Sequence, residues 1–435
     1  MIEGDKINFF WFRRDLRLED NAGLYRALKA GLPVQCIFIF DRNILDQLED
    51  KHDRRVVFIH RQLEKLNSEL KESGSSLLTF YGTPLDAWKK LSTDFSIQSV
   101  FTNRDYEPYA TERDQLVHDF LKTKNISFHT FKDQVIFEKS EIVKDDGKPY
   151  TIFTPYKNKW RSTLNESHLK SFLSEKLLSG FCKTSLNEII SLKQIGFENV
   201  DFTFPSETFD KSIICRYAET RDIPSLIGTS RLGVHLRFGT ISIRKLARLA
   251  LQENETFLNE LVWREFFMMI LWHFPEVVSQ SFKKQYDRIR WRNDEKEFAR
   301  WCNGTTGYPI VDAGMRELNE TGFMHNRVRM ITASFLTKHL LVDWRWGEAY
   351  FAKKLLDYEL SSNNGNWQWS AGTGSDAAPY FRIFNPSEQA KKFDPQLTYI
   401  RKWIPELNEL SYPPPIVDHA FARKRCLEAF KKVSG

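Results

Sequence analysis

Apolar positions follow different patterns in the two halves of the chain. Over residues 1–130, short apolar runs of strand length alternate with longer stretches of helical periodicity, such as Asp53–Glu72. Strands that alternate with helices are typical of a parallel sheet with crossover connections. An α/β domain with a doubly wound parallel sheet is therefore expected here. Its predicted strands are Ile7–Phe12, Val34–Phe40, Leu77–Tyr81 and Ser99–Thr102.

Beyond residue 205 the pattern becomes helical almost throughout and predicts a large all-α domain over 205–435. Residues 131–204 mix both patterns and are expected to form an interdomain linker. Asn, Gly and Trp residues break the helical period within Asp357–Trp369, so a structured loop is predicted there. The predicted helices are Arg244–Gln252, Phe257–Trp272, Ile310–Glu320, Asn326–Leu341 and Trp346–Leu356.

Composition narrows the class of protein. Hydrophobic residues make up 41% and charged residues 28%, as in globular proteins, and no apolar run approaches the ~18 residues of a membrane span. The five cysteines form no Cys-x-x-Cys and the N-terminus shows no export signal, so we expect no metal site and a cytoplasmic location. No G-x-G-x-x-G follows the first strand, which excludes a standard dinucleotide site there.

Charge and aromatic content favour a polyanionic or planar ligand. The net charge is +6, and nine of the 12 tryptophans lie beyond residue 250. Tryptophan surfaces of this density stack bases, stack a cofactor or pass electrons. Large helical cores that use Trp for packing are the alternative explanation.

One predicted helix carries a chemically mixed face. At helical spacing, a carboxyl, an indole, a guanidinium and a phenyl group share one side: Glu260, Trp263, Arg264 and Phe267. This face suits the wall of a pocket for a planar ligand, whereas a simple i,i+4 ion pair on a solvated surface is the other interpretation. In the next candidate helix, Asn326, Arg329 and Met330 also share a face. The Gly-bounded turn Gly228–Gly233 suits a phosphate.

Several sequence motifs, taken together, are highly specific for one protein family. They are Trp11–Arg17, Gly228–Leu232, Asn259–Phe266, Thr306–Ala313, His325–Met330, Asn363–Trp369 and Pro379–Pro386. With these motifs the chain resembles the DNA photolyase/cryptochrome family, and within it the class I cyclobutane pyrimidine dimer photolyases. The resemblance implies light-driven repair, in which photoexcited reduced FAD passes an electron to a dimer that is flipped out of DNA.

The resemblance also implies residue roles. The residues expected to hold the FAD are Tyr217, Thr229, Ser230, Arg231, Leu232, Gly233, Phe257, Arg264, Asn326, Arg329, Asp357, Tyr358, Glu359 and Asn363. Those expected to contact the dimer or the DNA are Arg221, Glu260, Trp263, Arg264, Asn326, Arg327, Met330, Trp369 and Gln389. Glu260 would stabilise the dimer radical anion, and Asn363 would lie near flavin N5. Electrons that photoreduce the flavin would travel along Trp291, Trp344 and Trp367.

Three positions depart from the family pattern. Glu359 stands where Asp is usual, Gly233 where Ser is frequent, and Phe257 where relatives often have Trp. Each change is expected to affect FAD binding or flavin potential rather than the reaction itself.

Several alternatives stay open at this point. Within the family they are a cryptochrome-type blue-light photoreceptor without repair activity, a (6-4) photolyase and a DASH-type protein. Asn326 argues against (6-4) repair, because those enzymes have His at that position. The expected partner is DNA that contains pyrimidine dimers, and we expect a monomer that does not bind membranes. A folate or deazaflavin antenna pigment is a further possibility, with Asn103–Tyr109 near its cleft.

Overall fold

The computed structural model describes residues 6–433. Its chain forms two compact units, each built from segments that lie apart in the sequence. The first unit is made of Met1–Glu138, Leu164–Thr208 and Leu232–Leu249. The second unit is made of Lys139–Thr163, Phe209–Arg231 and Ala250–Gly435. The stretch 131–204 thus contributes to both units, and the domain boundaries at 130 and 204 stay a prediction.

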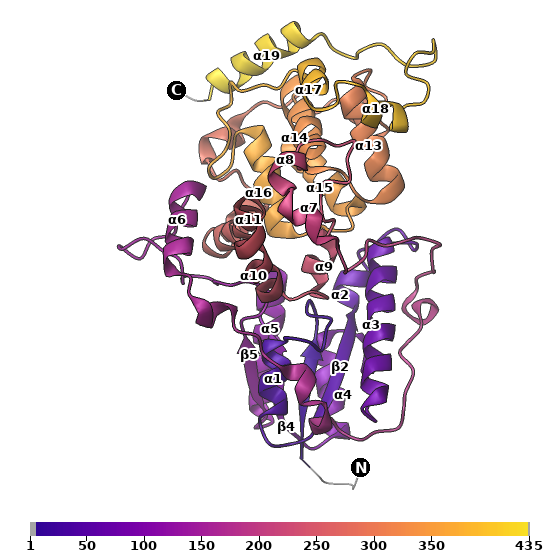
Figure 1. The fold of residues 1–435 in the computed structure, drawn as a ribbon, viewed down its shortest axis with the longest axis vertical. Helices are drawn as coiled ribbons and strands as arrows, with labels where there is room; N and C mark the ends of the chain where they lie inside the picture. Colours follow the sequence, from indigo (N-terminus) through magenta and orange to yellow (C-terminus); the bar gives the residue numbers. More distant parts are fainter. Residues whose placement is uncertain (1–5, 434–435) are drawn as a thin grey trace. The chain divides into compact units, whose positions relative to one another are not determined.

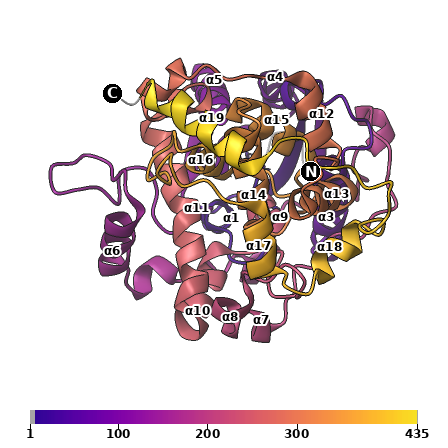
Figure 2. The ribbon, with the colours of Figure 1, turned by 90° about the horizontal axis from the view of Figure 1, so that it is seen from above.

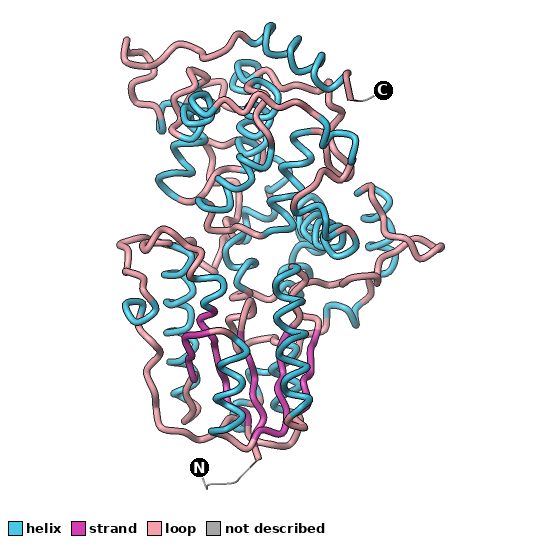
Figure 3. Tube along the Cα trace, turned by 180° about the vertical axis from the view of Figure 1, so that it is seen from behind, coloured by secondary structure: helices cyan, strands magenta, loops and turns pink. Residues whose placement is uncertain are grey.

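A five-stranded parallel sheet forms the centre of the first unit (Figure 1; Figure 3). The strands are β1 (Ile7–Phe12), β2 (Val34–Asp41), β3 (Leu78–Gly82), β4 (Ile97–Asn103) and β5 (Ser127–Phe131). Their order is β3-β2-β1-β4-β5. From β1 the chain winds to one edge, and from β4 it winds to the other, which confirms the predicted doubly wound sheet.

The sequence pattern finds β1 to β4, including the edge strand β3, and misses β5 at the other edge. Every residue of β1 and β2 is buried, so both read as continuous apolar runs. In β5, Ser127 and His129 are exposed. A strand with one solvated face lacks a continuous apolar run, and this one is too short for alternation to stand out.

Helices cover both faces of this sheet. Phe9 of β1 points to one side, where its ring lies 5.8 Å from the ring of Trp88 in α4 (Pro84–Asp94). Phe10 points to the opposite side, where its ring lies against Gly23 of α1 (Ala22–Leu28). The other helices of this unit are α2 (Arg42–Leu45), α3 (Arg54–Glu72), α5 (Pro108–Thr123) and α9 (Gly233–Phe238), and α10 (Ile243–Glu253) starts in it.

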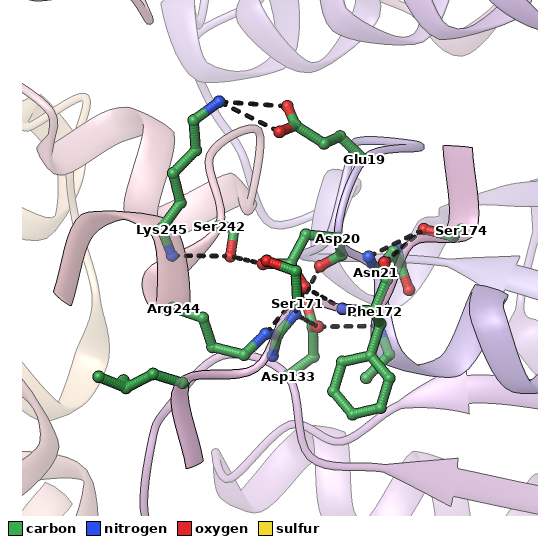
Figure 4. A network of polar contacts seen from close by, with 12 residues as sticks. Glu19, Asp20, Asn21, Asp133, Ser171, Phe172, Ser174, Ser242, Arg244 and Lys245 are labelled. Atoms are coloured by element: carbon green, nitrogen blue, oxygen red, sulfur yellow. Dashed lines mark hydrogen bonds and ion pairs between the residues drawn. The ribbon is translucent and has the colours of Figure 1, made fainter. Parts of the chain in front are cut away.

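A buried polar network joins distant segments of the first unit (Figure 4). The Asp20 carboxylate accepts hydrogen bonds from Ser242 Oγ at 2.6 Å and from Arg244 Nε at 3.0 Å. Asp133 accepts from Arg244 at 2.8 Å and from Arg17 at 2.7 Å. Burial alone would raise the pKa of Asp133, but the two guanidinium groups hold that pKa below its usual value. The network thereby anchors the start of α10 within the unit.

Removal of the Ser242 hydroxyl tests this network. The hydroxyl donates to Asp20 and accepts from the backbone N–H of Lys245 at 3.3 Å, in the first turn of α10. We expect Ser242→Ala to lower the free energy of unfolding by about 1–2 kcal/mol, measured by urea denaturation. Lys245→Ala is the control, because its ion pair with Glu19 is solvent-exposed and is worth less than about 1 kcal/mol. Equal losses in the two variants would contradict this prediction.

The second unit is built from helices and loops (Figure 1; Figure 2). Its helices are α6 (Phe153–Thr163), α7 (Lys211–Cys215), α8 (Tyr217–Thr220), α11 (Glu255–His273), α12 (Glu295–Cys302), α13 (Pro309–Thr321), α14 (Asn326–Ser334), α15 (Trp344–Lys354), α16 (Leu360–Ala371), α17 (Pro386–Phe393), α18 (Thr398–Trp403) and α19 (His419–Lys431). The predicted helix Asn326–Leu341 is divided, because a π-helical turn, Phe335–His339, follows α14. No helix within residues 6–433 combines the length and apolar character that a membrane crossing needs.

The structure places α16 where the sequence predicted a structured loop, so the prediction for most of Asp357–Trp369 is wrong. The polar residues that hide the helical period are buried and paired. Side-chain amides of Asn364 and Gln368 both donate to the carbonyl oxygen of Val277, at 2.9 and 3.0 Å. The side chains that recur with the helical period in α16 are amides and indoles. A pattern of hydrophobic positions does not register them as a buried helix face.

Candidate functional site

An open cavity of about 310 Å³, which we call the outer cavity, lies along one side of α11 in the second unit. All four side chains of the predicted α11 face line it, so their common orientation is confirmed. α14, α16 and Arg221 at the end of α8 supply the remaining walls. The lining residues are Arg221, Glu260, Trp263, Arg264, Phe267, Asn326, Met330, Ser362, Asn366 and Trp369.

Glu260 is the acidic group of the outer cavity. Its side chain is 32% exposed and forms an ion pair with Arg221. Burial raises the pKa of Glu260, and the neighbouring Arg221 opposes that rise. A carboxyl group with a raised pKa holds its proton to higher pH, and only the protonated form can donate a hydrogen bond.

Aromatic groups form the apolar part of the outer cavity. The ring of Trp263 lies 5.5 Å from that of Phe267, at an interplanar angle of 29°. Phe267 occupies this place because α16 has Gly365 opposite it, where an added Cβ would lie 2.1 Å from the phenyl ring. Trp369 faces the same cavity from α16. The result is a cleft with flat apolar walls and one carboxyl group.

A second, smaller cavity of about 90 Å³, the inner cavity, shares four lining residues with the outer one. The shared residues are Asn326, Met330, Ser362 and Asn366. The inner cavity is further lined by Arg329, Ala333, Phe351, Leu355, Asp357, Tyr358, Glu359, Asn363, Trp367 and Ser370. The predicted α14 face of Asn326, Arg329 and Met330 is therefore confirmed as a cavity wall.

The N-cap residue of α14 fixes where this wall of the inner cavity begins. His325 precedes α14, and its Nδ1 accepts a hydrogen bond from the backbone N–H of Arg327 at 3.2 Å. Burial lowers the pKa of His325 to about 4, so the neutral imidazole is available as an acceptor near neutral pH. Arg329 then follows one turn later with its guanidinium in the inner cavity.

An ion pair in the inner cavity leaves one oxygen available. Arg329 Nη2 donates to Asp357 Oδ2 at 2.9 Å, and Arg329 Nε donates to the carbonyl oxygen of Met324 at 2.7 Å. Asp357 Oδ1 is buried and has no hydrogen-bond partner among the residues that the structure describes. A buried carboxylate oxygen without a partner is costly, so this site favours a ligand that brings a hydroxyl or N–H donor.

Glu348 is a residue of this site that the sequence analysis missed. Asn363 Nδ2 donates to Glu348 Oε1 at 2.7 Å and to the Glu348 carbonyl oxygen at 3.1 Å. Burial raises the pKa of Glu348, and the bond from Asn363 partly offsets the rise. Both of these bonds use the amide nitrogen of Asn363, so its amide oxygen is the group available to a ligand in the inner cavity. Glu348 thus orients the Asn363 amide, and only the contact between α15 and α16 reveals this role.

Arg264 connects the two cavities. It lines the outer cavity and forms an ion pair at 3.4 Å with Glu359, which lines the inner cavity. Ser362 Oγ also donates to Glu359 at 3.1 Å. Glu359, the longer residue in place of the family's usual Asp, is 6% exposed and accommodated within these contacts.

Other predicted site residues lie away from the described linings of both cavities. Tyr217 packs edge-on against Phe257 at 5.2 Å, and burial raises the pKa of Tyr217. Arg327 pairs with Asp222 at 2.7 Å, and Gln389 lies in α17. The turn residues Thr229, Ser230 and Arg231 belong to the second unit, whereas Leu232 and Gly233 belong to the first. Their predicted ligand contacts stay predictions.

The three predicted electron-transfer tryptophans belong to the second unit. Trp367 lines the inner cavity and is buried, as is Trp344. Trp291 is half-buried and packs against the same hydrophobic core. Trp291 is thus the most exposed of the three, and the electron path itself stays a prediction.

Gly347 in α15 makes room for Trp367. A Cβ at this position would lie 2.1 Å from the Trp367 ring and 2.6 Å from Leu336. We expect Gly347→Ala to reduce the free energy of unfolding by about 1–3 kcal/mol, because the overpacked core must shift. Thermal or urea unfolding measures the loss. The double variant Gly347→Ala/Trp367→Phe should lose less than the sum of the two single changes, and strict additivity would contradict the steric explanation.

Comparisons with known proteins show what the chain as a whole resembles. The family model for the FAD binding domain of DNA photolyase matches residues 257–411, and that for DNA photolyase matches residues 8–173. The deoxyribodipyrimidine photo-lyase of Synechococcus sp. is 37% identical over 460 residues, which cover 96% of this chain and 94% of that protein. The class III photolyase of Agrobacterium tumefaciens superposes with a TM-score of 0.86 at 32% identity, covering 99% of both chains. The Synechocystis cryptochrome gives 0.86 at 25% identity, covering 99% of this chain and 100% of that one.

Proposed function

This chain belongs to the DNA photolyase family, and from that premise we propose that it repairs cyclobutane pyrimidine dimers in DNA with the energy of blue light. The enzyme is then a deoxyribodipyrimidine photo-lyase, which breaks carbon–carbon bonds. One observation carries the proposal: Glu260 faces a cavity bounded by the indoles of Trp263 and Trp369, and this cavity shares a wall with the inner one.

FAD is the cofactor, and the residues of the inner cavity suit part of it. Asp357 Oδ1 has no hydrogen-bond partner within residues 6–433 and favours a ligand that brings a donor such as a hydroxyl, and Arg329 supplies positive charge beside it. The cavity holds only a portion of so large a group, so we assign the rest to Tyr217, Phe257 and the turn residues Thr229, Ser230 and Arg231 of the same unit. Reduced FAD supplies a light-excited electron to the substrate.

The side chains of the outer cavity have separate roles in this proposal. In its protonated form, Glu260 donates a hydrogen bond to a carbonyl oxygen of the dimer. Negative charge develops on that oxygen only during the reaction, so the bond stabilises the reacting state more than the bound substrate. Trp263 and Trp369 contact the apolar faces of the dimer and exclude water. Arg221 contacts the DNA backbone once the dimer engages Glu260.

The outer cavity admits a lesion only after it leaves the duplex. Its volume of about 310 Å³ is at the lower end of small-molecule sites and suits two pyrimidine rings that are joined by a cyclobutane ring. Extrusion of a dimer costs less than extrusion of a normal pair, because the lesion is already poorly stacked. Binding should weaken with salt and be independent of sequence, since the remaining contacts are to phosphates.

A photoreceptor without repair activity is the second candidate, because the Synechocystis cryptochrome shares the fold. A sensor needs the inner cavity but has no need of a dimer pocket. Glu260, Trp263 and Trp369 line one common cavity here, and Asn363 lies in the adjoining one, which favours repair. For the same reason we propose DNA that contains pyrimidine dimers as the partner. We further propose that the protein is a cytoplasmic monomer.

A light-dependent repair assay tests the function. The flavin-loaded, reduced protein is mixed with an oligonucleotide that carries one thymine dimer and is illuminated with blue light. We expect the dimer to revert to two thymines under light and to persist in the dark. Absorption spectra before and after denaturation should report FAD and reveal a second pigment if one is present. Flavin-loaded protein that leaves the dimer intact under light would favour the photoreceptor.

A further inference from the structure

The indole of Trp263 stacks against a residue outside the predicted helical domain. The ring of Phe153, the first residue of α6, stacks on Trp263 with centroids 3.6 Å apart and an interplanar angle of 7°. Phe153 is 7% exposed and does not belong to the described lining of the outer cavity. It therefore covers part of Trp263 that the cavity does not use.

Phe153 is itself held by the loop that follows α16. Its backbone N–H donates to Asp376 Oδ2 at 3.1 Å, and Ser375 Oγ donates to the carbonyl oxygen of Thr151 at 2.7 Å. A carboxylate at the first N–H of a helix is also favoured by the helix dipole. These two bonds attach the start of α6 to residues 375–376.

The same loop begins at the other indole of the cavity. Trp369 lies in the last turn of α16, and the backbone N–H of Gly372 donates to the Trp369 carbonyl oxygen at 3.2 Å. A continuous series of contacts thus runs from Trp263 through Phe153 and Asp376 to the end of α16. We call Phe153 and Asp376, with the contacts they make, the brace.

We propose that Phe153 and Asp376 are positioning residues, which hold the indoles of Trp263 and Trp369 in place before a lesion arrives and thereby set the selectivity for dimers. This inference rests on the proposed function. An indole with one unsupported face has freedom to rotate, and that freedom must be given up on binding. A preformed wall avoids this entropic cost. The brace acts on dimer affinity and leaves the electron-transfer step unchanged, since neither residue lines the outer cavity.

Phe153→Leu removes the stacked ring and keeps an apolar side chain. Affinity is measured in the dark, with an oligonucleotide that carries one thymine dimer and with its undamaged counterpart. We expect dimer affinity to fall roughly threefold to tenfold, while undamaged DNA binds as before. The repair yield per bound dimer should not change. Phe153→Tyr keeps the ring and should retain most of the wild-type selectivity. An unchanged ratio of the two affinities in Phe153→Leu would overturn the proposal.

Substitutions of Asp376 separate its hydrogen bond from its backbone conformation, because this residue has a φ of +48°. Asn tolerates this region and keeps a side-chain acceptor, whereas Gly tolerates it and has none. We expect Asp376→Asn to bind dimers like the wild type and Asp376→Gly to lose selectivity in the manner of Phe153→Leu. Equal dimer affinity in the two Asp376 variants would overturn the role of the carboxylate.

Two controls separate this inference from the proposed function. Flavin content and unfolding temperature show whether a variant is folded, and the Asp376 pair carries the test if Phe153→Leu does not fold. If the wild type splits dimers in light but all variants bind them equally, the brace fails and the function stands. If the flavin-loaded wild type splits no dimers, the proposed function fails first.

Discussion

Glu260→Ala is expected to reduce the yield of dimer splitting per absorbed photon by roughly 100-fold. The carboxyl group faces the outer cavity, where it is placed to stabilise a charge that exists only during the reaction. Dimer binding should weaken by only about fivefold, the effect of one ordinary hydrogen bond. Yield is measured by the loss of dimers under a calibrated light dose, and affinity by titration in the dark. Equal losses of yield and affinity would remove the role assigned to Glu260.

The same residue predicts a pH dependence. Burial raises the pKa of Glu260 against the pull of Arg221, so its proton persists above the usual range of a glutamate. As pH rises through that raised pKa, the carboxyl becomes a carboxylate, which can only accept hydrogen bonds. The yield of the wild type should therefore fall with rising pH. Glu260→Gln keeps an N–H donor at every pH, so its yield should stay flat over the same interval.

Arg264→Met is expected to destabilise the protein by about 3 kcal/mol and to reduce its flavin content. The Arg264 and Glu359 side chains are only 10% and 6% exposed, so loss of the guanidinium leaves the Glu359 carboxylate undercompensated in a buried place. Flavin content should fall because Glu359 lines the inner cavity. Urea denaturation measures the stability, and the absorbance ratio of flavin to protein measures the content.

A double variant is the matched control for Arg264. In Arg264→Met/Glu359→Leu both charges are absent, and the buried pair is replaced by apolar groups of similar size. We expect this variant to regain at least half of the lost stability, since replacing a buried ion pair costs far less than breaking it. A double variant that is as unstable as Arg264→Met, or less stable, would show that the ion pair is not the source of the effect.

Much of the fold could be predicted from the sequence, with identifiable exceptions. The inner strands β1 and β2 are buried on both faces and appear in the sequence as apolar runs. The strand β5 was not predicted, because its Ser127 and His129 are exposed. The helix α16 was not predicted because its buried residues Asn364 and Gln368 are polar. Both failures have one cause: periodicity measures hydrophobicity, and these residues are placed by hydrogen bonding and by the edge of the sheet.

The residues of the candidate site likewise include some that the sequence predicts and some that only the structure reveals. Glu260, Trp263 and Arg264 could be found from the sequence, since helical spacing alone places them on one face of α11. Glu348 and Phe153 could not, because each acts through a residue of another helix and has no local pattern of its own. Gly347 and Gly365 likewise show their purpose only through the rings of Trp367 and Phe267, which lie against them in space.

The sequence by itself determined most of the element types, the doubly wound arrangement of the sheet, the family and the chemistry of the α11 face. These depend on interactions between residues near in the chain, or on motifs whose residue types survive as a pattern. Only the tertiary structure decided that Glu260 pairs with Arg221, that Arg264 reaches Glu359 and that Asp376 holds the helix carrying Phe153. Such contacts join residues 39 to 223 positions apart, and packing selects each from many sterically equivalent partners that the sequence does not distinguish.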